Sequence, residues 1–130
     1  MTNDEIRDFL QQSIDENRVM LFMKGTPNQP ACGFSARTAA ALNALGVQYA
    51  ALDILPDPRI REELSALSGW PTIPQLFVDK ELVGGSDIVI EMFEAGELAA
   101  LLGVEQPEEF AAEPQPEPVK RPIGLENRLD

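Results

Sequence analysis

The sequence VMLFMKGTPNQPACGFSARTAAALNALG at residues 19–46 carries the strongest structural signal in this chain. Its first five residues form a continuous apolar run, which is typical of a buried strand. A loop with two prolines follows, and apolar residues then recur at helical spacing from Phe34 to Leu45 until Gly46 ends the pattern. The stretch therefore predicts a strand, a loop and a helix, with Cys32 at the first turn of that helix.

Patterns on either side of this stretch extend the prediction. Helical and strand periodicities alternate, and strand, helix, strand implies a right-handed parallel crossover. The further predicted elements are a helix capped by Asn3, a strand over 47–53, a helix starting at Asp57-Pro58, hairpin strands over 75–78 and 82–84, a helix capped by Ser86 and a short helix over 97–102. This order predicts an α/β protein with a thioredoxin-like fold, in which helices flank a central four-stranded mixed sheet.

The composition changes near the C-terminus of the chain. From Gln106 onward, prolines and glutamates dominate and no apolar periodicity remains. Such a segment buries too little apolar surface to fold alone. We therefore expect one globular domain over 1–103 and an acidic, disordered tail over 104–130.

The charge balance and the N-terminus restrict the partners and the location of the protein. The chain has 22 acidic and 10 basic residues, a net charge of -12, which argues against nucleic acid or an anionic membrane as the main partner. The acidic start lacks the apolar core of a signal peptide, and no apolar run approaches the ~18 residues of a membrane span. We expect a soluble, cytoplasmic protein.

Cys32 is the only cysteine, and the chain has no histidine. Catalysis by a Cys-His or Ser-His-Asp set is therefore excluded, and no internal disulfide can form. A thiol at a helix N-terminus meets unpaired N–H groups that favour the thiolate, so Cys32 is predicted to be reactive. A buried, inert cysteine is the less favoured alternative.

Other candidate residues have alternative interpretations. Phe34 is more typical of core than of a binding surface. The segment from Gly84 to Asp87 joins a strand to a helix and forms either an anion site or plain turn-and-cap structure. Lys24 and Arg61 could hold a carboxylate near Cys32, although solvated surface charge is the commoner role.

Four motifs, taken together, resemble the monothiol glutaredoxins of the Cys-Gly-Phe-Ser type. They are Met23-Lys24-Gly25-Thr26-Pro27, Cys32-Gly33-Phe34-Ser35, Trp70-Pro71-Thr72-Ile73-Pro74-Gln75 and Gly84-Gly85-Ser86-Asp87-Ile88. Any one of them alone is a weak signal, but four in the same order are specific. The resemblance covers residues 1 to about 103 and implies a thioredoxin fold.

The resemblance also implies a groove that binds glutathione. A cis proline, here Pro74, would lie opposite the thiol of Cys32. Lys24 and Arg61 match the family's basic contacts to the glycine carboxylate of glutathione.

The remaining glutathione contacts follow from the same matching. The backbone of Ile73 would pair with the glutathione main chain, and Ser86 with Asp87 would hold its γ-glutamyl end. Many relatives carry a second cysteine at the position of Ser86, so an optional internal disulfide is not available here. The family's usual glycine or asparagine at the hairpin turn is Lys80.

The family typically holds a [2Fe-2S] cluster in a homodimer, with one cysteine from each protomer and one thiol from each of two glutathiones. By this resemblance, Cys32 would be the protein's cluster ligand. The expected function is transfer of the cluster to iron-sulfur acceptor proteins, also in complex with a BolA-like protein, and such a carrier is not strictly an enzyme. The alternative is a glutathione-dependent thiol-disulfide oxidoreductase, and the third possibility is a redox-silent interaction module.

Overall fold

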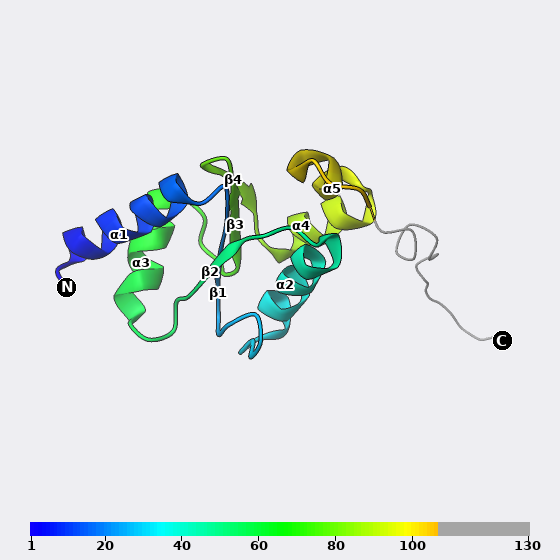
Figure 1. The fold of residues 1–130 in the computed structure, drawn as a ribbon. Helices are drawn as coiled ribbons and strands as arrows, with labels where there is room; N and C mark the ends of the chain where they lie inside the picture. The colour runs from blue at the N-terminus through cyan, green and yellow to red at the C-terminus, as the bar shows by residue number, and fades with distance from the viewer. Residues whose placement is uncertain (107–130) are drawn as a thin grey trace.

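The computed structural model describes residues 1–106, which fold as two layers of helices around one sheet (Figure 1). The elements are α1 (Asn3–Glu16), β1 (Val19–Met23), α2 (Gly33–Leu45), β2 (Ala50–Asp53), α3 (Pro58–Ser68), β3 (Gln75–Val78), β4 (Glu81–Gly84), α4 (Ser86–Glu94) and α5 (Glu97–Leu102). The strand order is β2-β1-β3-β4, with β1 and β2 parallel and the other neighbours antiparallel. The predicted thioredoxin-like fold with a four-stranded mixed sheet is confirmed.

Strand β1 is buried on both faces because alternate side chains enter two separate hydrophobic clusters. Val19, Leu21 and Met23 pack toward α2, α4 and α5, whereas Met20 and Phe22 pack toward α1 and α3. This explains why its sequence is a continuous apolar run rather than an alternating one. Figure 1 shows the two groups of helices on opposite sides of the sheet.

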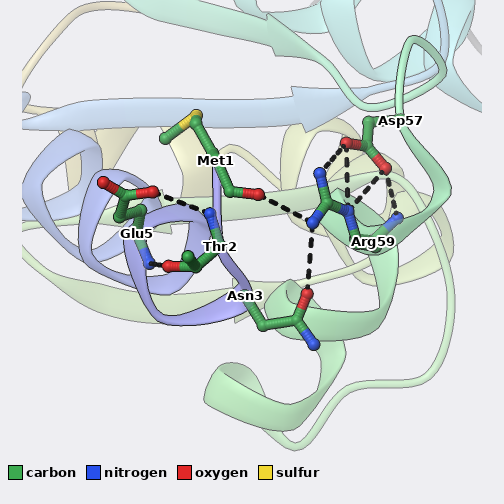
Figure 2. Close-up of polar contacts among 6 residues, drawn as sticks. All are labelled: Met1, Thr2, Asn3, Glu5, Asp57 and Arg59. Atoms are coloured by element: carbon green, nitrogen blue, oxygen red, sulfur yellow. Dashed lines mark hydrogen bonds and ion pairs between the residues drawn. The ribbon is translucent and has the colours of Figure 1, made fainter.

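The first helix begins one residue earlier than its sequence pattern indicated. Thr2, not Asn3, is the N-cap, and it forms a capping box with Glu5 in which each side chain accepts a backbone N–H of the other residue. Arg59 at the start of α3 donates to the carbonyl of Met1 at 2.7 Å and is held by the carboxylate of Asp57 (Figure 2). The N-terminus of α1 is therefore tied to the N-terminus of α3.

Three further details differ from the sequence expectation. The second strand begins at Ala50 rather than at residue 47. Gly85 is the N-cap of α4, so Ser86 is its first helical residue and makes no side-chain cap bond. The hairpin strand β4 begins at Glu81, directly after Asp79 and Lys80, which both have positive φ (51° and 71°) and form the tight turn without glycine.

The end of the described chain continues the packing slightly beyond the expected boundary. Val104 still packs against the cluster formed with α2, α4 and α5. The predicted disorder of the tail concerns residues that, from 107 onward, lie outside the described part of the chain. No helix within 1–106 is long and apolar enough to cross a membrane.

Candidate functional site

Four chain segments meet at one end of the strands because of the strand register. Met23 at the end of β1 pairs with Asp53 at the end of β2, and Phe22 pairs with Gln75 at the start of β3. Gly84 at the end of β4 pairs with Leu76. The loops that follow β1, β2 and β4 and the one that precedes β3 therefore emerge side by side.

The loop from β1 to Cys32 closes on itself through backbone bonds. The N–H of Ala31 donates to the carbonyl of Lys24 at 2.9 Å. Gly25 adopts φ +85°, and a Cβ at this residue would come within 2.5 Å of the carbonyl oxygen of Gln29. Only glycine fits so close an approach of two backbone segments, and this approach fixes the path of the chain into Cys32.

Asp53 joins this loop to the loop after β2. Its Oδ1 accepts the N–H of Gly25 at 2.9 Å and the N–H of Leu55 at 3.0 Å. One carboxylate oxygen thus holds the residue after Lys24 and the start of the segment that leads to α3. The sequence pattern gave no sign of this role beyond placing Asp53 at the end of a strand.

Cys32 is the N-cap of α2, so the predicted position at the helix start is confirmed, and the residue is half-buried rather than enclosed in the core. Its Sγ accepts the N–H of Ser35 at 3.4 Å. Burial raises the pKa of Cys32, but the N–H and hydroxyl of Ser35, the N–H of Phe34 and the charge of Lys24 act together to hold the pKa below its usual value. The arrangement favours the nucleophilic, metal-binding thiolate.

Ser35 lies between the thiol and the loop backbone and is completely buried. Its Oγ accepts the N–H of Lys24 at 3.0 Å and lies 3.6 Å from the Sγ of Cys32. The hydroxyl oxygen accepts the Lys24 N–H through one of its lone pairs, which leaves the hydroxyl proton free to be donated to a thiolate at Cys32. Ser35 therefore acts as a hydrogen-bond partner of the sulfur.

Cys32 and Ser35 form one wall of the site, and the segment before β3 forms a second wall. The Ile73–Pro74 peptide bond is cis, as the resemblance implied. Gln75 is fully buried, and its Nε2 donates to the carbonyl oxygens of Trp70 at 3.0 Å and Thr72 at 3.1 Å. One buried amide thus fixes the backbone that leads into the cis bond.

Gly85 brings the start of α4 against this wall. A Cβ at Gly85 would lie 3.1 Å from Nε1 of Trp70 and 3.4 Å from the carbonyl oxygen of Pro74. A larger residue would push the two segments apart. The Trp-Pro motif and the Gly-Gly motif, distant in sequence, therefore form one surface.

A small pocket of about 170 Å³ lies on this surface and is lined by Phe34, Thr72, Ile73, Ser86 and Asp87. The expectation that Phe34 belongs to the core is wrong, because its side chain is 54% exposed. Its ring forms part of the pocket wall, while its backbone N–H lowers the pKa of Cys32. Phe34 thus connects the thiol to the pocket.

The structure brings together most of the predicted site residues. Ile73, Ser86 and Asp87 line the pocket, and the ammonium of Lys24 is close enough to lower the pKa of Cys32. Arg61 lies on an exposed position of α3 and is not among the residues that line the pocket. Sequence analysis missed the pocket residue Thr72.

The chain supplies very few metal ligands at this site. Within residues 1–106 there is no group of three or more His, Cys, Asp or Glu side chains that could hold a metal ion. A thioredoxin-fold protein with one activated thiol beside a small pocket is the class that fold and site define.

Comparisons with known proteins agree with this class. A family model described as Glutaredoxin matches residues 19–83. "Glutaredoxin 4" of Escherichia coli is 55% identical over 93 residues, covering 72% of this chain and 81% of the relative. "Probable monothiol glutaredoxin 2" of Rickettsia typhi is 49% identical over 102 residues, covering 78% of this chain and 91% of the relative.

A solved structure shows the same fold. The solution structure of a monomeric truncated mutant of Trypanosoma brucei 1-C-Grx1 has a TM-score of 0.69 and 40% identity, covering 75% of this chain and 92% of that one. The chain belongs to the glutaredoxin family, and its single cysteine fits the monothiol type. The alignments leave a larger share of this chain unmatched than of its relatives, so this chain carries additional sequence.

Proposed function

We propose that this chain binds glutathione at the pocket and, as a homodimer, holds a [2Fe-2S] cluster that it passes to iron-sulfur acceptor proteins in the cytoplasm. The observation that carries the proposal is the state of the single thiol: Cys32 is half-buried, its pKa is lowered, and it lies next to a pocket. A [2Fe-2S] cluster takes four thiolates, so two copies of Cys32 leave two positions for glutathione.

The pocket has groups that fit the two ends of glutathione. Asp87 supports binding of the γ-glutamyl ammonium, while the N–H groups at the start of α4 suit its α-carboxylate. Lys24 and Arg61 are the basic residues proposed for the glycine carboxylate. The backbone of Ile73, which follows the two carbonyls held by the Gln75 amide, offers main-chain bonds.

The test is anaerobic reconstitution with iron, sulfide and glutathione, followed by visible absorption spectroscopy and size determination. We expect a coloured dimer that forms only when glutathione is present, and Cys32→Ser should remain a colourless monomer. A colourless wild-type monomer would refute cluster binding. Addition of a BolA-like protein should convert the homodimer to a mixed complex.

Separate variants test the glutathione contacts. Lys24→Ala and Arg61→Ala each remove one charge-assisted contact, so both should shorten the lifetime of the cluster without changing the unfolding midpoint. Lys80→Ala at the hairpin turn is a control for loss of a positive charge. Cluster lifetimes equal to wild type in both variants would reject the glutathione contacts of Lys24 and Arg61.

A second candidate is favoured by the lowered pKa of Cys32, because a thiolate is the attacking species in disulfide exchange. The Cys32 thiolate would attack the glutathione sulfur of a protein–glutathione mixed disulfide, form a Cys32–glutathione disulfide and release the protein thiolate. A second glutathione thiolate would then release Cys32 and leave as oxidised glutathione. Turnover of a glutathione mixed disulfide that Cys32→Ser abolishes would support it, and turnover equal to that of Cys32→Ser would exclude it.

A further inference from the structure

A second hollow of about 250 Å³ lies between α2 and α4, and we call it the α2–α4 groove. Ala40 and Ala44 of α2 and Ile90 and Phe93 of α4 supply much of its apolar lining, with Arg37 and Glu94 as the charged members. Alanine side chains on α2 leave the space that larger residues would fill. The groove is therefore a consequence of the Ala-rich helix that follows Cys32.

The lining residues of this groove follow those of the pocket beside Cys32 along the same two helices. Phe34 lines the pocket, and Arg37, one turn later in α2, lines the groove. The guanidinium of Arg37 lies 5.1 Å from the centre of the Phe34 ring and joins the two surfaces by a cation–π contact. On α4, Asp87 of the pocket is likewise followed one turn later by Ile90 of the groove.

The chain itself supplies a candidate segment for the groove. Val104, near the end of the described chain, packs on the same hydrophobic cluster as Ile90 and Phe93. Twenty-four residues, 107–130, follow the described part, and Phe110 is the only aromatic residue among them. It is four residues beyond Gln106, a reach of up to ~14 Å.

The charges and the apolar residues of this segment also complement those of the groove. Phe110 is followed by Ala111 and Ala112, and Glu109 and Glu113 flank this short apolar run. The apolar run matches the groove lining, and either glutamate could pair with Arg37 at the groove. The local sequence differs from the rest of the segment, which is dominated by proline and polar residues.

We propose that residues 107–113 of the same chain dock in the α2–α4 groove, with the Phe110 ring against Ile90 and Phe93 and a flanking glutamate toward Arg37. Covalent attachment gives this segment a high effective concentration at the groove, which favours it over an external partner of similar chemistry. The unmatched length of this chain relative to its relatives is consistent with a contact specific to this chain. The docked segment would cover the surface next to the pocket wall formed by Phe34.

Methyl NMR on the full chain tests the contact. Phe110→Ala should shift the methyl signals of Ala40, Ala44 and Ile90, because the ring current of the phenyl group is lost. Val119→Ala, an apolar substitution further along the same segment, is the matched control. The signal of Ile14, in the cluster on the other face of the sheet, should not move in either variant.

Blocking the groove provides an independent measurement. Ala40→Glu places a charged side chain on an exposed position of α2 in the groove, and Ala100→Glu makes the same change at an exposed position of α5. In the full chain, Ala40→Glu should speed amide hydrogen exchange across 109–113 several-fold, whereas Ala100→Glu should leave exchange there unchanged.

Clear outcomes would overturn the proposal. Wild-type groove signals in Phe110→Ala, equal shifts in Val119→Ala, or unchanged exchange in Ala40→Glu would each contradict docking. Shifts that disappear on dilution together with a dimer would show that a second chain supplies the segment, which also contradicts it. Because none of these measurements involves glutathione or a cluster, their failure is distinct from failure of the proposed function.

Discussion

Two buried polar side chains, Ser35 and Gln75, hold the two walls of the pocket in different ways. Each is fully buried, and each satisfies backbone groups of a neighbouring loop. Ser35 also touches the sulfur of Cys32, whereas the Nε2 of Gln75 donates to two backbone carbonyl oxygens. The Ser35 side therefore sets the chemistry of the thiol, and the Gln75 side sets the shape of the binding surface.

The difference shows that burial of a polar group can serve either reactivity or architecture within one small site. A group that contacts the reacting atom changes a pKa when it is removed. A group that contacts only backbone changes stability and geometry, because its partners are left without donors. The two roles can be separated experimentally.

The largest effect is expected for Gln75→Leu. This substitution leaves the carbonyl oxygens of Trp70 and Thr72 without their donor, and we expect a loss of ~3 kcal/mol in the free energy of unfolding. The pKa of Cys32 should stay as in the wild type. Urea unfolding measures the first quantity and the pH dependence of Cys32 alkylation measures the second, with exposed Gln48→Leu as the control.

A smaller loss of stability but a change in reactivity is expected for Ser35→Ala. The N–H of Lys24 loses its acceptor, which should cost ~1 kcal/mol. The pKa of Cys32 should rise because the hydroxyl of Ser35 no longer donates to the thiolate. Ser65→Ala in α3 is a matched control, and an unchanged alkylation profile in Ser35→Ala would remove the distinction between the two walls.

The same variant changes the pH dependence of stability. In the wild type, the pKa of Cys32 is lower in the folded chain than in the unfolded one, so the thiolate stabilises the fold above the ordinary thiol pKa. This contribution is lost as the pH falls through the folded-state pKa. Urea unfolding at a series of pH values should therefore show a smaller gain with rising pH in Ser35→Ala than in the wild type.

A gain in stability is expected at the far end of the hairpin that begins with Gln75. Lys80 adopts φ +71°, which is unfavourable for a residue with a Cβ. Lys80→Gly should raise the free energy of unfolding by ~1 kcal/mol. In the double variant, this gain should partly offset the loss caused by Gln75→Leu, and the two changes should be additive because the sites lie at opposite ends of the strand. A destabilised Lys80→Gly protein would disprove this reading of the turn.

The smallest effect is expected for Lys24→Gln. Lys24 acts on the thiol through its N–H, which Ser35 accepts, and through its ammonium charge. Glutamine keeps the first contact and removes the second, so the pKa of Cys32 should rise less than in Ser35→Ala, and stability should not change. High salt should remove the difference between wild type and Lys24→Gln, whereas Lys80→Gln should match the wild type throughout.

Much of the fold followed from local sequence signals. Alternation of apolar patterns and the stops at Gly46 and Gly96 predicted the element order, and Asp57-Pro58 marked the start of α3 correctly. The first cap was missed by one residue because Thr2 and Asn3 are both good capping residues. The spacing of Thr2 and Glu5 was the available signal for the capping box.

The site was predictable only in part. Helical spacing assigned Phe34 to the inner face of α2, but spacing does not show whether another element covers that end of the helix. The contacts of Gln75 and Asp53 depend on loops that meet through strand register, so no local pattern predicts them. The residues of the four motifs were identified through the resemblance of these motifs to the monothiol glutaredoxins, not from local physical signals.

The position of Ser35 also bears on how such a site can evolve. Exchange of its oxygen for sulfur would create a second thiol three residues after Cys32, and a single nucleotide change can turn a serine codon into a cysteine codon. The same exchange would replace the acceptor of the Lys24 amide with a much weaker one at a fully buried position. Exchange of Ser35 for cysteine would therefore loosen the attachment of the loop after β1 to the start of α2.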